Sequence, residues 1–572
     1  MFLENVKSFF INILSFDDKF PLLFTQFYFW AFFALVFTGL TFLKNKILLR
    51  NVFLMFASLF FYFKTSGLFV ILLLFTTLNC FWVGKRIDLT SSIKKRKWLV
   101  FLGVFVNLFL LAYFKYAYFF TSVYNSMFQT NIEIVNYLAL WVNNFSGSSY
   151  FRVDQIILPV GISFYTFQSI SYVIDVHRKR ISHTPNFFDF GFFVSFFPGL
   201  VAGPIIRANQ FMPQLYKKFF LSRRQFGIAV FWILNGLIKK LILSDYLAVN
   251  FVDRVIENPQ FFTSFENLSA IFVYSLQVYA DFSGYTDIAI GVAMLMGFYM
   301  PKNFASPYKA TNPGDFWKRW HISLSTWLKD YLYIPLGGNR KGKFRTNVNL
   351  MITMLLGGLW HGASWNFVIW GGLNGLGIVI FKKWRKFDNA NRLFITLLLF
   401  NVSFLLYVLF PFPAFKIALV WTGLIVLGAL LAYFYLDFYN RKPLKQLNRG
   451  WSIFLTFVFI TFTRLFFRSG SNLDPAEQTA HAWNTAKAMV NQIGGVWNWA
   501  QIPEIVATYW AVFLLFALGM FIHWIPERWK RWYRLNFTLL PIWAIGIAVV
   551  ITVFVVYQFI TADLQPFIYF QF

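Results

Sequence analysis

Long apolar segments recur along the whole chain and are separated by short polar stretches. About fourteen of them approach the roughly 20 mostly apolar residues that an α-helix needs to cross a bilayer. Several segments are short or interrupted by Gly and Pro, so the pattern predicts about 11–14 membrane helices, some of them re-entrant or interfacial. The segments lie near residues 22–43, 51–63, 67–84, 98–122, 155–175, 225–249, 268–298, 346–361, 364–381, 393–411, 416–436, 451–468, 506–526 and 538–560.

Lysine and arginine are concentrated in alternate loops, whereas the loops 123–154, 250–267 and 469–505 contain few of them. Threading the apolar segments in order places every basic cluster on one side of the membrane, which the positive-inside bias identifies as the cytoplasm. The same threading predicts that both termini are extracytoplasmic. The basic clusters are Lys44–Arg50, Lys85–Lys97, His177–Arg180, Lys217–Arg224, Lys302–Arg345, Lys382–Arg392, Arg441–Arg449 and Arg528–Arg534.

Composition agrees with a membrane protein. Of the 572 residues, 58% are hydrophobic and only 13% are charged, about half the charged share of a typical soluble domain. The net charge of +28 is accounted for by the basic loops, so we expect lipid and not nucleic acid as the partner. The single cysteine, Cys80, excludes an internal disulfide and two-cysteine metal sites, and we predict no metal. We expect one transmembrane domain over residues 1–572, with a core at about 155–381 and peripheral helices at 1–122 and 393–572.

The first polar interruption lies in residues 155–224. Pro159, Gly161, Pro198 and Gly203 interrupt what would otherwise be straight apolar helices. Broken backbone at membrane depth is tolerated where it is buried in protein or lines a cavity. A kinked helix followed by a loop and a re-entrant segment lining a cavity both fit this pattern.

The second interruption places polar side chains inside the apolar run 268–298. They are Gln277, Tyr279, Asp281, Ser283 and Asp287. Charges inside a bilayer cost several kcal/mol, so they face a partner or a cavity. The two carboxylates fit either a hydrogen-bond network that ties helices together or a direct role in chemistry. All five are candidates to contact substrate or line a tunnel, and so are five residues further along the chain: Trp317, Arg319, Trp320, Ser364 and Asn366.

Residues 312–338 are predicted to form one helix at the membrane interface. Asn312 is a suitable N-cap before Pro313, and Trp317, Trp320, Leu324, Trp327 and Tyr331 recur at helical spacing. Arg319 lies among the charged residues between them. At this spacing His321 would lie at the edge of the apolar face, beside Trp317 and Leu324.

Residues 355–374 contain a histidine, His361, in a run that is otherwise apolar and rich in Gly and Trp. An ionisable residue within a membrane segment is a functional candidate by default, although a hydrogen-bonded histidine that packs helices together is the alternative. Ser364 and Asn366 follow within five positions. The remaining histidines are expected to be solvated or interfacial: His177, His183, His481 and His523.

Taken in order, these blocks resemble the membrane-bound O-acyltransferase family, and in particular the bacterial alginate O-acetyltransferase membrane subunits. Teichoic-acid D-alanyl transferases are similar at a greater distance. The C-terminal stretch Gln565–Phe572 and the motif Phe466-Phe467-Arg468-Ser469 are also similar to that branch. The blocks are Leu158–Tyr165, Pro198–Arg207, Gln277–Asp287, Asn312–Gly338 and Leu359–Gly372.

The resemblance implies a helical fold around a central tunnel, in a bacterial inner membrane. It implies an acyl donor that arrives from the cytoplasm, acetyl-CoA or another thioester, with no tightly bound cofactor. It also implies an extracytoplasmic polysaccharide acceptor that is reached through a separate partner protein. It identifies His361 as the catalytic histidine and His321 as the second characteristic histidine.

A mechanism follows from imidazole chemistry. His361 would take the proton of the acceptor hydroxyl as that oxygen attacks the thioester carbonyl, since the pKa of a neutral imidazole lies near working pH. His321 could position the donor or hold a proton, and Asn366 or backbone N–H groups near Gly362 could stabilise the oxyanion. Ser364 lies three residues after His361, which is close enough on a helix for the two side chains to interact, so an acyl-enzyme on Ser364 remains open.

Three other functions remain open. D-alanyl or other acyl transfer to a cell-wall polymer would use the same chemistry. A transporter or channel would also contain intramembrane His and Asp residues and broken helices. A noncatalytic assembly subunit would not depend on His361 for its function.

Overall fold

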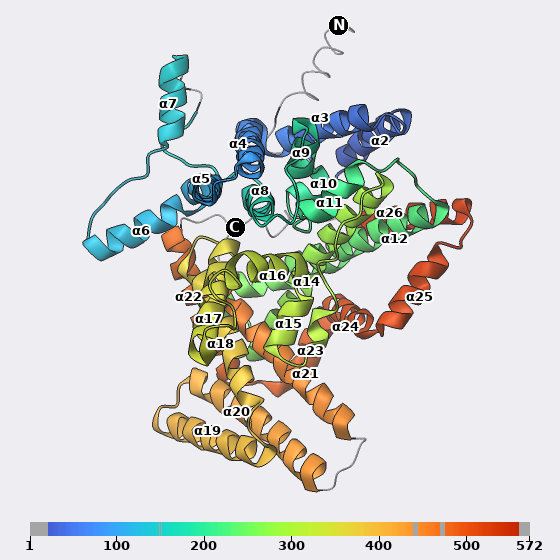
Figure 1. Ribbon diagram of the computed structural model, residues 1–572. Helices are drawn as coiled ribbons and strands as arrows, with labels where there is room; N and C mark the ends of the chain where they lie inside the picture. Colours follow the sequence, from blue (N-terminus) through green and yellow to red (C-terminus); the bar gives the residue numbers. More distant parts are fainter. Residues whose placement is uncertain are drawn as a thin grey trace. The chain divides into compact units, whose positions relative to one another are not determined.

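The computed structural model describes residues 16, 21–147, 149, 151–438, 444–468 and 475–559 (Figure 1). Within these ranges the regular elements are all helices. Seven helices there are long and apolar enough to cross a membrane, or eight if the bent pair Trp499–Thr508 and Trp510–Trp524 forms one span. The prediction of a polytopic all-α membrane protein is confirmed. The terminal block Gln565–Phe572 lies outside the described residues.

The chain forms two compact units, and the first comprises Met1–Leu237, Tyr285–Lys302 and Tyr533–Val549. This division does not test the single transmembrane domain with a core at about 155–381, which therefore stays a prediction. The helices of the first unit are α2 (Phe27–Phe42), α3 (Ile47–Ser66), η1 (Gly67–Phe69), α4 (Val70–Leu89), α5 (Ile93–Leu111), η2 (Ala112–Tyr116), α6 (Ala117–Phe128), α7 (Tyr137–Ser146), α8 (Ile162–His177), α9 (Phe187–Ser195), α10 (Phe197–Leu200), α11 (Ala208–Leu215) and α12 (Arg223–Leu237).

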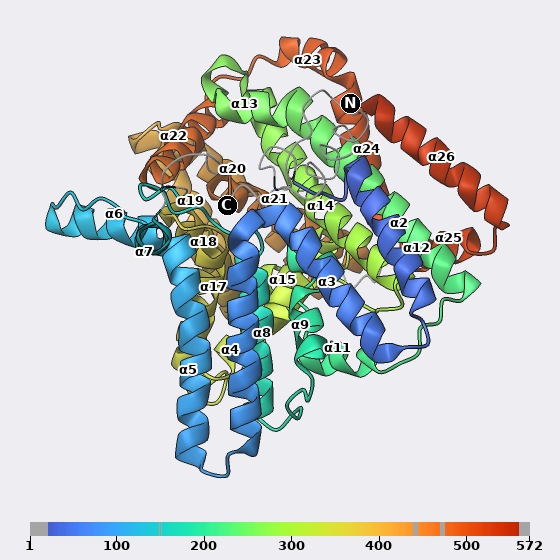
Figure 2. The ribbon, with the colours of Figure 1, turned by 90° about the horizontal axis from the view of Figure 1, so that it is seen from above.

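In the first unit α4, α5 and α8 lie side by side (Figure 2). Small residues allow the close approach, because a Cβ at Gly84 would lie 2.5 Å from the Tyr172 ring. The broken segment predicted at 155–224 contains the 16-residue helix α8 and the three shorter helices α9 to α11, whose side chains are mostly buried. Its interruptions therefore lie within protein, where irregular backbone is tolerated.

The second unit comprises Ile238–Gly284, Asn303–Trp532 and Val550–Phe572. Three helices contribute residues to both units: α14 (Ser264–Leu295), α25 (Glu527–Phe537) and α26 (Ile542–Phe559). The other helices of the second unit are η3 (Ile238–Asp245), η4 (Ala248–Val252), α13 (Asp253–Glu257), η5 (Pro259–Phe261), η6 (Pro307–Lys309), α15 (Pro313–Arg319), α16 (Ile322–Leu328), η7 (Lys329–Tyr333), α17 (Gly342–His361), α18 (Trp365–Trp384), α19 (Asn389–Leu409), α20 (Pro413–Leu430), η8 (Leu431–Phe438), α21 (Leu444–Thr463), η9 (Arg464–Phe466), α22 (Pro475–Gly494), η10 (Trp499–Gln501), α23 (Ile502–Thr508) and α24 (Trp510–Trp524).

Helices α17 and α18 form a tight antiparallel pair in the second unit (Figure 1). Gly358 and Gly371 meet at their contact, where a Cβ on Gly358 would lie 2.2 Å from the carbonyl oxygen of Phe367. Only glycine allows the two backbones to approach this closely. The pair therefore fixes the position of the last turn of α17, which ends at His361.

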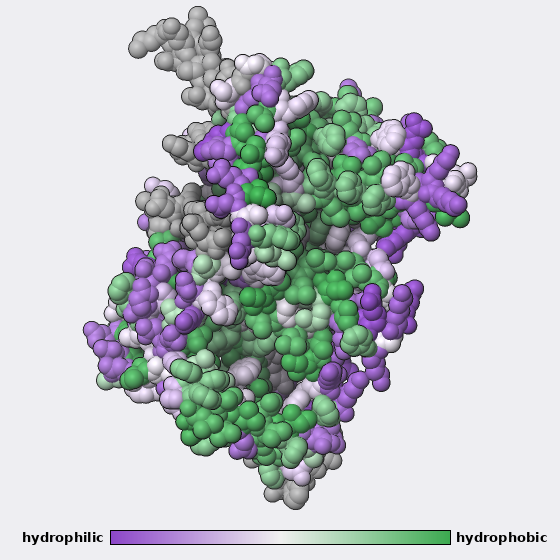
Figure 3. Space-filling view, turned by 90° about the vertical axis from the view of Figure 1, so that its left-hand side faces the viewer, coloured by the Kyte–Doolittle hydropathy of each residue, from purple (hydrophilic) through white to green (hydrophobic). Residues whose placement is uncertain are grey.

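Helices α19 and α20 expose their apolar side chains. Only 6% of the apolar window of α19 and 11% of that of α20 is buried. Figure 3 shows hydrophobic side chains gathered at the foot of the view, at the height where Figure 1 places these helices. Apolar surface of this extent requires lipid as its solvent.

The single interfacial helix predicted over 312–338 is wrong, because α15 ends at Arg319 and α16 begins at Ile322. Its predicted start is confirmed: Asn312 Oδ1 accepts the backbone N–H of Asp315 at 2.9 Å, and Pro313 occupies the first turn. His321 lies at the break with a left-handed φ of 45°. The break turns His321 into the protein, where it is fully buried and not at the edge of an exposed face.

Candidate active site

The His361 imidazole lies among aromatic rings at the end of α17. Its ring centroid is 5.0 Å from Trp360, 5.1 Å from Trp370 and 5.4 Å from Phe467. The side chain is only 2% exposed, so these rings fix its orientation. The helix stops here because Gly362 adopts an extended conformation in which the Phe367 ring occupies the space of a Cβ.

His321 lies beside His361, with 6.3 Å between the ring centroids. Asn303 holds it through Oδ1, which is 3.3 Å from His321 Nδ1 and also accepts the backbone N–H and the hydroxyl of Ser323 at 3.0 and 2.7 Å. Because a backbone N–H can only donate, this atom of Asn303 is the oxygen. His321 therefore carries its proton on Nδ1 and has the lone pair on Nε2.

Burial also sets the charge of His321. It lowers the pKa of this imidazole to about 3, because the charged form loses its hydration. The ring is therefore neutral at physiological pH. Phe282 of α14 packs edge-on against it at 4.6 Å, and Trp360 contacts it from α17 at 5.7 Å.

A cavity of about 110 Å³ opens beside His361. Its walls are formed by α15, α16, α17 and α18, so the helices on both sides of the break at His321 contribute to it. The wall residues include Trp317, Leu324, Ser325, Gly357, His361 and Trp370. A concave site with apolar walls and one ionisable group is the usual form of a small-molecule site.

The segment after α21 packs against His361 through Phe467. Asn366 donates its Nδ2 hydrogen to the carbonyl oxygen of Phe466 at 3.0 Å, and Ser364 hydrogen-bonds to Asn366 Oδ1. This connection fixes Phe467, whose ring packs against both His361 and Trp370. From the sequence this segment was notable only because Phe466–Ser469 resembles a motif of a known family.

Ser364 is not on the helix of His361. It is the N-cap of α18 and is fully buried, so the helical proximity expected from a three-residue spacing is wrong. The two residues are instead separated by the extended turn at Gly362.

Arg464 is a buried cation that the sequence analysis missed. It is 3% exposed and donates from Nη1 to the carbonyl oxygen of Ser275 at 2.9 Å and to the hydroxyl of Tyr308 at 2.5 Å. Its guanidinium lies 4.6 Å from the centroid of the Trp320 ring. Within the described residues its hydrogen bonds involve no carboxylate, whereas Arg468, one turn later, pairs with Asp253 at 2.8 Å.

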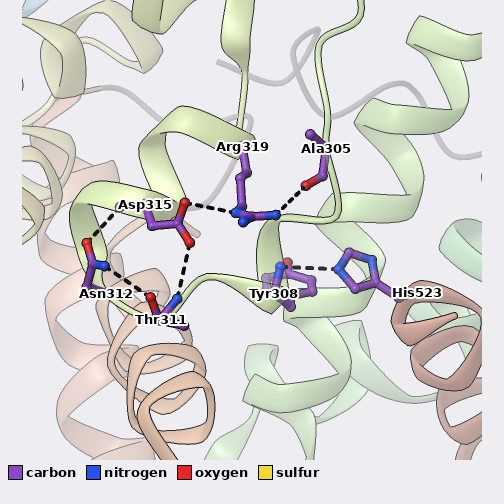
Figure 4. Close-up of polar contacts among 7 residues, drawn as sticks. All are labelled: Ala305, Tyr308, Thr311, Asn312, Asp315, Arg319 and His523. Carbon is purple, nitrogen blue, oxygen red and sulfur yellow. Dashed lines mark hydrogen bonds and ion pairs between the residues drawn. The ribbon is translucent and has the colours of Figure 1, made fainter. Parts of the chain in front are cut away.

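Tyr308 connects η6 to α24 through a hydrogen bond with His523 (Figure 4). His523 Nε2 accepts the backbone N–H of Tyr308 at 3.2 Å, and its ring packs against Tyr279 at 4.7 Å. His523 is 3% exposed, so the expectation that it is solvated or interfacial is wrong. In the same view Arg319 pairs with Asp315 at 3.0 Å, which ties α15 to itself.

The two carboxylates of α14 have different surroundings. Asp281 pairs with Lys240 at 2.8 Å, and Lys240 also pairs with Asp245 at 2.8 Å. Asp287 belongs to the first unit and accepts the side-chain N–H of Asn235 at 2.6 Å. In both cases the carboxylate pairs with a side chain of another helix. Of the two possibilities for these residues, a network that ties helices together and a direct role in chemistry, this geometry has the form of the first.

The remaining candidates fall into two groups. Trp317 lines the cavity and donates from Nε1 to Asn374 Oδ1 at 3.3 Å. Gln277 and Ser283 have buried side-chain oxygens on α14 and do not line the described cavity. Of the predicted site residues, His361 and Trp317 line the cavity, and the His321 ring lies beside that of His361. Ser364 and Asn366 join the start of α18 to the segment that contains Phe467.

A cavity walled by an imidazole inside a polytopic helical protein suits acid–base chemistry on a substrate shielded from water. Comparison with known proteins defines its class. Residues 108–421 match the membrane-bound O-acyltransferase family. The chain belongs to this family and is an O-acyltransferase.

Three relatives describe the branch. The probable alginate O-acetylase AlgI of Azotobacter vinelandii is 36% identical over 82% of this chain and 91% of its own length. That of Pseudomonas putida is 40% identical over 62% of this chain and 70% of its length. The peptidoglycan O-acetyltransferase of Helicobacter pylori is 36% identical over 67% of this chain and 74% of its length.

Proposed function

We propose that the protein transfers an acetyl group from acetyl-CoA to a hydroxyl of an extracytoplasmic polysaccharide, at the cavity beside His361. The observation that carries this proposal is the buried imidazole in the wall of that cavity, paired with a second imidazole of fixed tautomer. The names of the relatives, which act on alginate and peptidoglycan, support a carbohydrate acceptor.

The size of the cavity supports a short acyl group. About 110 Å³ is well below the 300–1,000 Å³ or so of a pocket that encloses a whole drug-sized ligand. It suits the reacting end of a donor, bounded by Trp317 and Trp370. A D-alanyl group would add a charged ammonium, for which none of the side chains that line the cavity offers a carboxylate.

In the proposed reaction His361 accepts the proton of the acceptor hydroxyl while that oxygen attacks the thioester carbon. The tetrahedral intermediate then collapses, the C–S bond breaks, and the imidazolium returns the proton to the leaving thiolate. Positioned general-base catalysis contributes about 10²–10⁴-fold in rate. Transfer is direct in this scheme, and the Ser364 hydroxyl stays engaged with Asn366.

His321 and Arg464 act beside His361. Because Asn303 holds His321 in one tautomer and the two imidazole rings lie 6.3 Å apart, we assign to His321 the role of a neutral residue that positions His361. Arg464 is a positioning residue, which holds Trp320 and Tyr308 behind α15. Asn366, first considered for the oxyanion, is assigned the positioning of Phe467 through the Phe466 carbonyl.

We further propose an inner-membrane location with both termini extracytoplasmic. The acceptor then lies on the opposite side of the membrane from acetyl-CoA, and a separate extracytoplasmic acetyltransferase completes the transfer to the polymer. The basic loops, which the positive-inside bias assigns to the cytoplasm, support this orientation.

The test measures transfer from labelled acetyl-CoA by the purified protein. His361→Ala should abolish transfer while the protein remains folded, and His481→Ala is the matched control because His481 is exposed on α22. Near-normal activity of His361→Ala would refute the assignment and favour an assembly subunit. Movement of solute without consumption of donor would indicate a transporter.

A further inference from the structure

A second and larger cavity lies in the first unit, and none of the residues that line it takes part in the proposed reaction. It measures about 630 Å³ and is formed by the loop after α4, the start of α5 and the loop after α8. Three cations line it together with hydroxyl groups and one carboxylate. The residues that matter here are Arg96, Lys179, Arg180, Ser91, Ser182 and Asp88.

Chain continuity places this groove at a membrane surface. The candidate spans Ile47–Leu89 and Ile93–Phe128 are joined by only three residues, 90–92, and two of these line the groove. Helix α8 packs against both spans and contributes the loop that begins at Arg178. A groove at the shared end of packed membrane helices lies at the level of lipid headgroups.

The backbone presents Lys179 to the groove at a conformational cost. Lys179 has a left-handed φ of 56°, with its N–H bonded to the carbonyl of Val176 at 3.0 Å and the next N–H bonded to that of Asp175 at 2.9 Å. This is the Schellman end of a helix, at the position that glycine usually occupies. A lysine where glycine would be easier indicates that its side chain serves a function.

Arg96 contributes a buried part of the same surface. Its Nη2 donates to the carbonyl oxygen of His177 at 2.8 Å, which caps α8. Its Nε is buried without a hydrogen-bond partner among the described residues. The positive charge also affects His177. Burial lowers the pKa of this histidine most, and the nearby charges of Arg96, Arg178 and Lys97 lower it further.

The acids near the groove are already occupied. Asp88 accepts both the backbone N–H and the ring nitrogen of His183, at 3.0 and 2.8 Å. Asp175 is 1% exposed and faces Arg180 at 3.4 Å. In the part of the chain that the structure describes, neither Lys179 nor Arg96 forms an ion pair with a carboxylate, although the charge of Arg96 helps to lower the pKa of Asp88. Three cations face one carboxylate in the lining, so the groove keeps an excess of positive charge.

We propose that this groove binds the phosphate group of an anionic phospholipid at the membrane surface. The cations attract the phosphodiester, and the hydroxyls of Ser91 and Ser182 suit the polar glycerol of a headgroup such as phosphatidylglycerol. The site is independent of acyl transfer, and its role is to fix the ends of α4, α5 and α8 against the lipid surface.

The test measures binding of short-chain phosphatidylglycerol, and of phosphatidylcholine of the same chain length, to the full-length protein in detergent. Lys179→Gly combined with Arg96→Gln should weaken phosphatidylglycerol binding at least tenfold and leave phosphatidylcholine binding unchanged. Lys179→Gly alone relieves the backbone strain at the left-handed position. The thermal midpoint of this variant should therefore not fall, whereas its affinity for phosphatidylglycerol should.

The matched control is Lys94→Gln with Lys95→Gln, which removes the same charge from exposed positions of α5 outside the groove. An equal loss in the control would reduce the effect to general attraction and overturn the proposal. Displacement of the lipid by millimolar inorganic phosphate would indicate a site for free phosphate, and displacement by acetyl-CoA a donor site. Either result would also overturn it.

Discussion

The glycine contact between α17 and α18 gives the sharpest test of how the site is built. In Gly358→Ala the new methyl group would lie 2.2 Å from the carbonyl oxygen of Phe367 and 3.0 Å from the Gly371 Cα. Ordinary contact begins at about 3.4 Å, so the helices must separate by roughly 1 Å, since both opposing groups are backbone. Such overpacking costs about 1–3 kcal/mol.

The displacement acts where His361 is positioned. His361 follows Gly358 by three residues on α17, whereas Trp370, against which its ring packs at 5.1 Å, lies on α18. A misplacement of about 1 Å at a reacting group can lower the rate about 10²-fold. We therefore expect Gly358→Ala to reduce turnover of labelled acetyl-CoA about 10²-fold, although the protein still inserts and folds.

Gly372→Ala is the matched control. It places a methyl group on the neighbouring position of α18, where the nearest atom is Cδ2 of Leu355 at 3.3 Å, the flexible end of a side chain. Its activity should remain within about twofold of the parent protein, because a leucine side chain can yield. Equal activity of Gly358→Ala and Gly372→Ala, with equal thermal midpoints, would show that the close crossing does not position His361.

Three further predictions concern the groups around His361. Asn303→Leu removes the acceptor that fixes the tautomer of His321. One such hydrogen bond is worth about 1 kcal/mol, so turnover of labelled acetyl-CoA should fall about fivefold to tenfold. An unchanged rate would contradict the tautomer assignment. Arg464→Gln, assayed in the same way, should raise KM or lower kcat about tenfold by releasing Trp320, and Arg464→Lys should not restore it because lysine lacks the planar fork. The pKa of His321 is about 3 in the fold and about 6.5 in the unfolded chain. Folding stability is therefore full above pH 6.5 and falls as the pH drops, by about 2 kcal/mol at pH 5, because the unfolded chain binds a proton that the folded protein does not. Thermal midpoints measured at pH 7 and pH 5 should show a smaller drop in His321→Asn than in the parent protein.

The membrane fold was predictable because a lipid-exposed helix can be recognised from the apolar composition of its own residues. Each of α19 and α20 is apolar nearly all round, and neither needs a tertiary partner to be recognised. His361 was predictable for a similar reason, since an ionisable side chain in such a run is rare. Both inferences depend on local composition alone.

The break at His321 was not predictable from its neighbourhood. The aromatic residues from Trp317 to Tyr331 keep helical spacing across it. The break is held by Asn303, which lies 18 residues earlier and binds the backbone of both Ile322 and Ser323. A tertiary contact has overridden the local helical pattern.

The partners of Arg464 and Asp281 were hidden for a different reason. Lys240 and Asp245 are five residues apart, a spacing that brings side chains together in the π-helical turn of η3 and not in the α-helix that the apolar run suggests. Arg464 binds Ser275 and Tyr308, which are 189 and 156 residues away. Without a structure, nothing in one sequence joins such positions.

The left-handed backbone at His321 also limits how this position can evolve. Glycine, asparagine and aspartate adopt a φ of 45° at little cost, whereas other residues adopt it with strain. A lineage that lost the imidazole would therefore move most easily to asparagine, which keeps a hydrogen-bonding side chain at the same turn. Substitution to alanine would both remove the ring and strain the turn. The backbone conformation at position 321 therefore limits which residues can replace the histidine.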